Sequence, residues 1–281
     1  MTGGAVPVCL TIGSSDSSGG AGIQGDIKAF AAVGCYAATV LVGVTAQNTT
    51  GIRQRHPVPL PMVRAQFAAV LDDLAVAAIK VGATWSPELV DTIADLLEQV
   101  TVPIVIDPVL ASAAGSTLGT DVEQLCQRVR QRLFPLATVV TPNADEARAL
   151  ARLGPASSHE GLAVALAGAG ARSVLVSADS ATPVDVFYDG TELVRIGGER
   201  HAGRRDHGAG CAHSAAIAGL LAHGEPVGAA VRTAHELVAD GVRHALSAVG
   251  SGVHPVDVLP ISGITARRVD RSASPALTGS P

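Results

Sequence analysis

The segment with the clearest chemical content is HGAGC (His207–Cys211), which precedes an Ala- and Leu-rich stretch. Successive backbone N–H groups around Gly208, Ala209 and Gly210, at a helix start, would form an anion hole that the helix dipole reinforces. The same position favours the thiolate of Cys211, which could then act as a base or a nucleophile. A lone cysteine is more often a small buried hydrophobe, but its place directly after Gly-Ala-Gly weighs against that alternative.

A second glycine-rich segment, Gly13–Asp26, joins the first expected strand to the first expected helix. Its glycine spacing fits neither the dinucleotide fingerprint GxGxxG nor the Walker A pattern GxxxxGK[ST]. Such a loop lets the backbone lie directly against a small ligand, and Asp26 could accept hydrogen bonds from an amino group. A flexible turn with a helix cap is the alternative interpretation.

Gln47 lies in the segment TAQNT (Thr45–Thr49), directly after the second expected strand. Its amide offers both a donor and an acceptor, which suits the edge of a heteroaromatic ring. An ordinary capped turn is an equally good interpretation of this segment taken alone.

Oxygen-bearing side chains follow two further strands. Asn143 and Glu146 are three residues apart at a strand-to-helix junction, and Asp107 ends another strand. Oxygen ligands at this spacing suit Mg²⁺ or its bound waters. The alternative for Asn143 and Glu146 is a helix cap with a glutamate at the third helical position.

The elements that must position these residues alternate along the chain. Continuous apolar runs, typical of strands buried on both faces, are expected at Val8–Ile12, Ala38–Val44, Ala78–Val81, Ile104–Ile106, Thr138–Thr141 and Ser173–Ser177. Amphipathic helices are expected at Gly22–Val33, Leu60–Leu74, Pro87–Gln99, Val122–Leu133, Ala144–Leu153, Glu160–Gly170, Cys211–His223 and Val227–Ala248. A hairpin with an Asp189-Gly190 turn should join Asp185–Tyr188 to Glu192–Ile196.

This repeated strand-then-helix order predicts an α/β fold with a mainly parallel central sheet and helices on both faces. We expect one α/β domain over residues 1–266 and a disordered Ser/Pro/Arg-rich tail over residues 267–281. In a sheet of this kind, ligands bind beyond the carboxyl ends of the strands, where the segments above are expected to lie.

Composition excludes several classes of protein. The 281 residues are 47% hydrophobic, 2% aromatic and 16% charged, with 31 glycines, so the core must use small side chains. The net charge of −5 offers no footprint for nucleic acid or an anionic membrane, and the chain has no apolar run of the ~20 residues that span a bilayer. Four scattered cysteines, without CxxC pairs, favour a reduced cytoplasmic protein.

Taken together and in this order, six segments resemble the hydroxymethylpyrimidine/phosphomethylpyrimidine kinases of thiamine biosynthesis, within the ribokinase-like family. The segments are SDSSGGAGIQGD (Ser15–Asp26), TAQNT (Thr45–Thr49), IKVG (Ile79–Gly82), DPV (Asp107–Val109), TPNADEA (Thr141–Ala147) and HGAGC (His207–Cys211). The resemblance covers nearly the whole chain, from Val8 to Pro255. The six are specific as a set, although no single one would be.

The resemblance implies a three-layer α/β/α fold, a homodimer, and transfer of the γ-phosphoryl group of ATP, with Mg²⁺, to a hydroxymethyl group. In this interpretation Cys211 is the base and residues 208–210 form the anion hole. The aminopyrimidine substrate would be held by Ser14, Ala21, Asp26, Gln47, Ala83 and Val109. The nucleotide and its metal would be held by Asp107, Asn143, Glu146, Ser177 and Arg205, with Asp107 and Glu146 as the metal ligands.

The chain also departs from the family pattern. Lysines are expected by resemblance near Ser177, within Ser112–Gly115 and between Gly250 and Gly252, and all three are absent. Lys28 and Lys80 are the only lysines of the chain, against eighteen arginines. Arg204 and Arg205 could substitute in part, although a planar guanidinium is not a point charge.

Further departures lie where the substrate would bind. Ser14 stands where a glycine is usual, Ala83 where a methionine is usual, and Ala209 replaces the threonine of GTGC. Three hypotheses follow: a pyrimidine kinase, a related kinase acting on another hydroxymethyl ring of the pyridoxal type, and a pyrimidine-binding protein without phosphoryl transfer.

Overall fold

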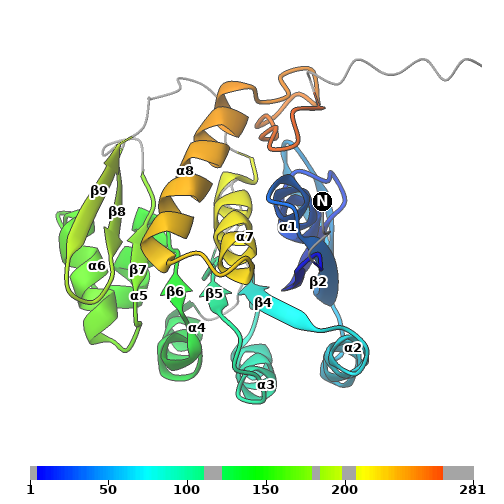
Figure 1. Cartoon of the computed structure of the whole chain (residues 1–281), viewed down its shortest axis with the longest axis horizontal. Coiled ribbons are helices and arrows are strands. Elements are labelled where there is room, and N and C mark those ends of the chain that lie inside the picture. Colours follow the sequence, from blue (N-terminus) through cyan, green and yellow to red (C-terminus); the bar gives the residue numbers. More distant parts are fainter. Residues whose placement is uncertain (1–4, 111–121, 179–183, 198–206, 262–281) are drawn as a thin grey trace, which may run out of the picture.

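The computed structural model describes residues 5–110, 122–178, 184–197 and 207–261, and these residues share one nine-stranded sheet (Figure 1). The strands are β1 (Val8–Asp16), β2 (Tyr36–Asn48), β3 (Gly51–Pro57), β4 (Val76–Val81), β5 (Ile104–Ile106), β6 (Val139–Val140), β7 (Val174–Val176), β8 (Val184–Tyr188) and β9 (Leu193–Gly197). Their order across the sheet is β3-β2-β1-β4-β5-β6-β7-β8-β9.

The six strands from β2 to β7 in this order run parallel, which confirms the mainly parallel sheet. β3 pairs antiparallel with β2 at one edge, and the hairpin β8–β9 pairs antiparallel with β7 at the other. The hairpin turns at Asp189 and Gly190 as predicted, and Gly190 takes a φ of 98° there.

Helices cover both faces of the sheet and make a three-layer α/β/α structure (Figure 1). One face carries α1 (Gly22–Ala32), α7 (Ala209–Ala222) and α8 (Val227–Arg243). The other carries α2 (Leu60–Leu71), α3 (Pro87–Leu97), α4 (Val122–Arg128), α5 (Ala144–Ala151) and α6 (His159–Gly168). α4 continues into a wider turn over Val129–Leu133 and a tight one over Phe134–Leu136.

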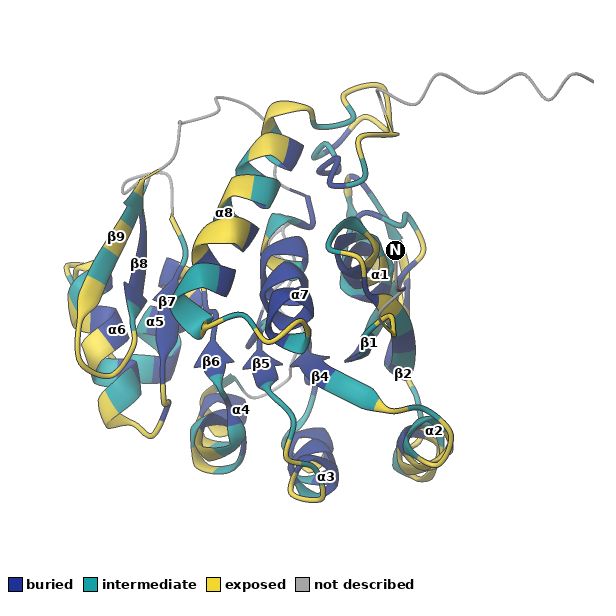
Figure 2. Cartoon of the chain, in the orientation of Figure 1, coloured by how far each residue is buried: buried dark blue, intermediate teal, exposed yellow. Residues whose placement is uncertain are grey.

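Many of the small residues of the chain lie in α7, a helix that is buried almost all round (Figure 2). It packs between α1 and α8 and against the sheet. A Cβ at Gly219 would lie 2.4 Å from Val33, so a larger residue there would push α1 away. Close packing of this kind needs Ala and Gly at the contacts, and it explains why the core contains so few aromatic residues.

The structure corrects the predicted elements at several points. β3 was not predicted, because its residues are mostly exposed and polar and lack an apolar run. β2 extends through Gln47 to Asn48, so the TAQNT segment lies at the end of the strand and in the turn to β3, not after the strand. α8 ends at Arg243 and not at Ala248.

None of the described helices is long and apolar enough to cross a membrane. The tail expected at residues 267–281 lies outside the residues that the structure describes.

Candidate active site

The predicted site residues lie along the edge where the parallel strands end, as expected for a sheet of this type. The segments after β1, β2, β4 and β5 form one part of this edge, and those after β6 and β7 form another. The start of α7 lies over the first part, since the loop before it contacts the loop after β1.

The predicted anion hole lies at the helix start that follows Gly208. This residue caps α7 with a φ of 84°, and α7 begins at Ala209. Ala212 donates the first intrahelical hydrogen bond to the Gly208 carbonyl, at 2.8 Å. The N–H groups of Ala209, Gly210 and Cys211 precede it and therefore have no carbonyl within the helix to bind. A Cβ at Gly210 would meet nothing within 4 Å, so this side of the turn is open to a ligand.

Gly208 is required by close packing as well as by its backbone angle. A Cβ there would lie 1.9 Å from the carbonyl oxygen of Gly20, in the first glycine-rich loop. Gly20 in turn faces His207, whose ring would lie 2.1 Å from a Cβ at that position. The two glycine-rich loops are thus pressed against each other, which the sequence alone did not predict.

Cys211 lies in the first turn of α7 and is partly buried. The expectation that its thiolate is favoured is wrong: desolvation by burial raises the pKa of the thiol to about 12, and Asp107 and Asp26 add to the rise. The charge of Lys80 lowers the pKa of Cys211 but does not outweigh these effects.

Lys80, Asp26 and Asp107 form a buried group that we call the lysine cluster. Lys80 Nζ lies 2.9 and 3.0 Å from the two carboxylate oxygens of Asp26, and 3.6 Å from Asp107 Oδ2. Thr11 Oγ1 donates to Asp26 at 2.6 Å, and Ser214 Oγ donates to Asp107 at 3.0 Å. The neighbouring carboxylates raise the pKa of Lys80, so it stays protonated. This buried cation compensates the carboxylates from within the fold.

Asp26 is fully buried, and both of its oxygens already accept hydrogen bonds from Lys80. Burial raises its pKa, although Lys80 and Thr11 act in the opposite direction. The predicted contact with an amino group of the substrate stays a prediction. What the structure adds is a link from Asp26, through Lys80, to the surroundings of Cys211.

Asp16 and His207 are a pair that the sequence analysis missed. His207 Nε2 lies 3.1 Å from Asp16 Oδ2, and both side chains are buried. Asp16 also accepts from the N–H groups of Ser18 and Ala21, at 2.8 and 2.9 Å. Hydrogen bonds from His207 and Ser18 hold the pKa of Asp16 below its usual range. This carboxylate shapes the first loop around Ala21 and ties it to the anion hole. The first strand was expected to end at Ile12, and β1 instead extends to Asp16, so the sequence pattern did not single out this carboxylate.

Gln47 is joined to the first loop through its backbone, because its N–H and carbonyl both bind Ser17 Oγ, at 2.8 and 2.6 Å. Its side-chain oxygen accepts from Thr45 Oγ1 at 3.2 Å. Ser14 pairs with Gly43 at an irregularity in β1, one strand away. The predicted substrate residues therefore lie on two segments that are held together: Ser14 at the end of β1 and Ala21 in the loop after it, and Gln47 at the end of β2.

Ala83 and Val109 lie in a small apolar cluster with Trp85 and Ile52, which we call the apolar wall. The indole of Trp85 packs where Gly43 leaves room: a Cβ at Gly43 would lie 2.1 Å from its six-membered ring. Trp85 is 9% exposed, and its Nε1 has no hydrogen-bond partner in the part of the chain that the structure describes. Trp85 was not among the predicted residues, although it is the single tryptophan of the sequence.

Asn143 and Glu146, the cap pair, sit at the start of α5 and form the capping box that the sequence analysis named as an alternative. Asn143 Oδ1 accepts from Glu146 N–H at 2.9 Å, and Glu146 Oε2 accepts from Asn143 N–H at 3.0 Å. Glu146 Oε1 also accepts from Leu110 N–H, at 3.2 Å. Burial and the charge of Asp107 raise the pKa of Glu146 to about 8.

Mg²⁺ fits this donor set. Asp107 and Glu146 are buried carboxylates, and the charge of Asp107 helps to raise the pKa of Glu146; a dication would relieve that repulsion. Mg²⁺ usually takes one or two protein carboxylates and completes its shell with water and phosphate oxygens. The capping role of Glu146 does not compete, since a carboxylate has about four lone-pair sites and backbone N–H groups occupy two.

Ser177 lies beside the cap pair: it bridges to Asn143 across the ends of β6 and β7, and its N–H donates to Pro142 at 3.1 Å. Arg205 and Ser112–Gly115 lie outside the described residues. The stretch Gly250–Gly252 packs on the turn after β2, where Gly252 N–H donates to Thr49 Oγ1 at 3.1 Å.

The comparisons with known proteins agree with this geometry. A family model described as phosphomethylpyrimidine kinase matches residues 16–257. The chain belongs to the phosphomethylpyrimidine kinase family. A hydroxymethylpyrimidine/phosphomethylpyrimidine kinase of Streptomyces coelicolor is 39% identical over 255 residues, which are 89% of this chain and 94% of that protein.

Solved structures place the fold among vitamin kinases. An ADP complex of Bacillus subtilis pyridoxal kinase has a TM-score of 0.84 and 30% identity, and covers 92% of this chain and 100% of its own. Staphylococcus aureus pyridoxal kinase with AMP-PCP and pyridoxal has a TM-score of 0.82 and 28% identity, covering 91% of this chain and 94% of its own.

As a member of the phosphomethylpyrimidine kinase family, the chain is a phosphotransferase, and the nucleotide complexes of its structural relatives imply ATP as the donor.

Proposed function

We propose that this kinase transfers the γ-phosphoryl group of ATP to the hydroxymethyl group of 4-amino-5-hydroxymethyl-2-methylpyrimidine, to its monophosphate, or to both. The observation that carries the proposal is the shared edge. The residues before Cys211 pack on the loop that holds Ala21, this loop binds the end of β2 at Gln47, and Lys80 is close enough to lower the pKa of Cys211. The name of the Streptomyces coelicolor relative supports the pyrimidine as acceptor.

In the proposed reaction, the substrate oxygen attacks the γ-phosphorus, the bond to the β–γ bridging oxygen breaks, and ADP leaves. The thiolate of Cys211 takes the proton of the hydroxymethyl group. Since the pKa of Cys211 is raised to about 12, forming that thiolate costs free energy near neutral pH, and Lys80 reduces the cost through its charge. Phosphoryl transfer passes through a loose transition state, so positioning and charge stabilisation matter more than a strong base.

The backbone N–H groups at Ala209, Gly210 and Cys211 would stabilise the charge on the transferring phosphoryl group. Asp107 and Glu146 would hold Mg²⁺, which neutralises phosphate charge when bound. Asn143 and Ser177, side by side at the ends of β6 and β7, would face the nucleotide. Ser14, Asp26 and Gln47, with the apolar wall of Ala83 and Val109, would position the ring.

The test is a product assay with purified protein, Mg·ATP and a panel of rings: the pyrimidine alcohol, its monophosphate and pyridoxal. We expect phosphorylated pyrimidine, detected by mass, and a loss of about 10²–10⁴-fold in kcat with Cys211→Ala. Turnover of pyridoxal alone would contradict the proposal and favour the pyridoxal-type kinase, which the structural relatives make the second candidate. Binding without turnover of any ring would favour a pyrimidine-binding protein that has lost catalysis.

We also infer a homodimer, as the family resemblance implies. Val44 on β2 is 43% exposed and pairs with His56 of the edge strand β3, and exposed apolar groups near a sheet edge are commonly covered by a partner. Light scattering should give twice the chain mass, and Val44→Asp should lower the measured mass.

A cytoplasmic location accords with the four free cysteines, and fractionation of cells would test it.

A further inference from the structure

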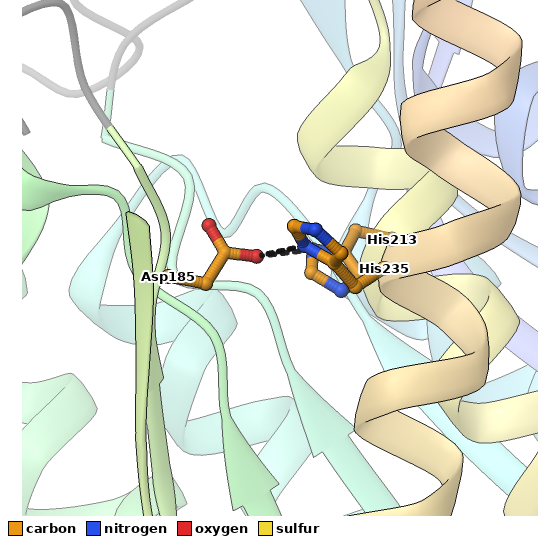
Figure 3. A group of neighbouring side chains, drawn as sticks. All are labelled: Asp185, His213 and His235. Carbon is orange, nitrogen blue, oxygen red and sulfur yellow. Dashed lines mark hydrogen bonds and ion pairs between the residues drawn. The ribbon is translucent and has the colours of Figure 1, made fainter. Parts of the chain in front are cut away.

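A second group of chemically active side chains shares no residue with the lysine cluster or the cap pair. Asp185 comes from β8, His213 from α7 and His235 from α8, and the three side chains converge between the hairpin and the two helices (Figure 3). Asp185 Oδ2 lies 2.8 Å from His235 Nδ1 and 3.9 Å from His213 Nδ1. One ligand atom from each residue can be chosen so that all three lie within 4.8 Å of one another.

The group is buried, and one of its nitrogens is unsatisfied. Asp185 and His213 are 5% and 7% exposed, and His235 is partly buried. His213 Nε2 has no hydrogen-bond partner among the described residues, although the atom is shielded from solvent. Burial lowers the pKa of His213, so its ring is neutral and keeps a lone pair for a ligand. A buried polar atom without a partner calls for an explanation, and a bound ion is one.

The carboxylate is already oriented toward the two imidazoles. Asp185 Oδ1 accepts from the N–H of Ala178 at 2.7 Å, which leaves Oδ2 facing His213 and His235. Outer hydrogen bonds of this kind fix a ligand's direction at metal sites. The hydrogen bond to Asp185 raises the pKa of His235, so a cation at this imidazole would compete with a proton.

We propose that Asp185, His213 and His235 form a binding site for a first-row transition dication, with Zn²⁺ as its best match. Two imidazole nitrogens and one carboxylate oxygen are the donors that Zn²⁺ prefers, and Mg²⁺ prefers oxygen alone. Three protein ligands leave a fourth, tetrahedral position for water. Bonds of about 2.0–2.1 Å put tetrahedral ligands roughly 3.3 Å apart. One ligand atom from each residue lies within 4.8 Å of the other two, and small side-chain rotations bring such atoms to that spacing.

The site would join three elements, two of which, β8 and α8, are already linked by the hydrogen bond between Asp185 and His235. A bound ion would link the hairpin β8–β9 to α7 and α8. Its ligand Asp185 accepts a hydrogen bond from Ala178, the residue that follows Ser177 in the sequence. The site is separate from the all-oxygen donor set of Asp107 and Glu146. The inference therefore does not depend on the proposed reaction.

The test is metal binding by the full chain after chelator treatment, with Co²⁺ as a spectroscopic probe and Zn²⁺ as its competitor. We expect one tightly bound ion per chain, visible Co²⁺ bands that Zn²⁺ abolishes, and a higher Tm with Zn²⁺. His235→Ala and Asp185→Asn should each weaken binding at least tenfold, and the second preserves the shape of the site. His213→Leu should remove the bands.

The matched control is His244→Ala, at the residue that caps the C-terminal end of α8, the helix that carries His235. His244 and Asp240 form an exposed pair with 3.4 Å between Nδ1 and Oδ1. His244→Ala therefore removes an exposed imidazole next to a carboxylate and leaves the proposed site intact. Its affinity and stoichiometry should equal those of the parent. The proposal is overturned if the parent binds no ion more tightly than His235→Ala and Asp185→Asn do, or if His244→Ala alone removes the binding.

Discussion

The lysine cluster and the cap pair both contain buried carboxylates at the same edge of the sheet, but the negative charge of these carboxylates is balanced differently in the two groups. Asp26 and Asp107 surround Lys80, a cation supplied by the chain itself. Glu146 is held only by backbone N–H groups in the described part of the chain, and its pKa rises to about 8. The first group is compensated by the fold, whereas the second gains most from a cation that arrives from outside. Asp107 belongs to the lysine cluster and is also a proposed metal ligand, so it connects the internally compensated group to the proposed metal and nucleotide site.

Breaking the lysine cluster should have the largest effect. Lys80→Met leaves two buried carboxylates without their cation, and we expect a loss of about 3–5 kcal/mol in the free energy of unfolding, measured with urea. Lys28→Met, at the only other lysine, is the control, because Lys28 is only partly buried and donates to the Gly19 carbonyl. Adding Asp26→Asn should recover part of the loss. A cost below about 1 kcal/mol would show that the cluster is not compensated as described.

The contact between the glycine-rich loops should rank next. Gly208 and Gly224 share a φ of 84°, but only Gly208 faces an obstacle, the Gly20 carbonyl at 1.9 Å from an added Cβ. Gly224→Ala should therefore cost about 1 kcal/mol from the backbone angle alone. Gly208→Ala should cost roughly 3 kcal/mol, since the overpacking adds to the strain. Equal costs in urea unfolding would mean that the loops separate easily, and that the anion hole is not rigidly held.

The pH dependence of unfolding of Glu146→Gln tests whether the Glu146 carboxyl lacks a compensating cation. The carboxyl pKa is raised on folding, so the folded chain holds a proton that the unfolded chain releases. Wild-type stability should therefore fall as pH rises from about 4.5 to about 8, and then level off. The variant lacks this loss and should gain on the order of 4 kcal/mol relative to wild type between pH 5 and pH 8.5. Its activity should also need more Mg²⁺. Parallel stability curves for the two proteins would contradict the raised pKa.

The apolar wall should give the smallest change. Trp85→Phe keeps an aromatic ring against Gly43 and removes the buried Nε1 without a partner, so unfolding should change by less than about 1 kcal/mol. If the indole contacts the ring of the substrate, KM should rise severalfold while kcat stays near its original value. An unchanged KM for every acceptor would show that the apolar wall does not take part in substrate binding.

Much of the site was predictable because parallel strands bring their carboxyl ends to one edge. Asp107, Asn143 and Ser177 follow three different strands, and the structure brings Asn143 and Ser177 side by side. The start of α7 was also predictable from Gly-Ala-Gly before an Ala-rich run, to within two residues. β3 could not be predicted, because its exposed polar residues take strand form only by pairing with β2.

The electrostatics of the site could not be deduced from the segments. A helix start predicts a favoured thiolate at Cys211, but burial and two nearby carboxylates reverse the direction of the pKa shift. Trp85 belongs to the apolar wall only because Gly43, 42 positions earlier in the chain, leaves room for its ring. These effects depend on what surrounds an atom in space.

The sequence by itself determined the α/β architecture, the family and the segments that carry the chemistry, because hydrophobic periodicity and motif spacing are local properties of the chain. The tertiary structure alone decided which charges are compensated. It placed Lys80 between Asp26 and Asp107, and brought Asp185, His213 and His235 together from three elements. Desolvation and Coulomb interactions depend on distance and burial, and neither is written in the order of the residues.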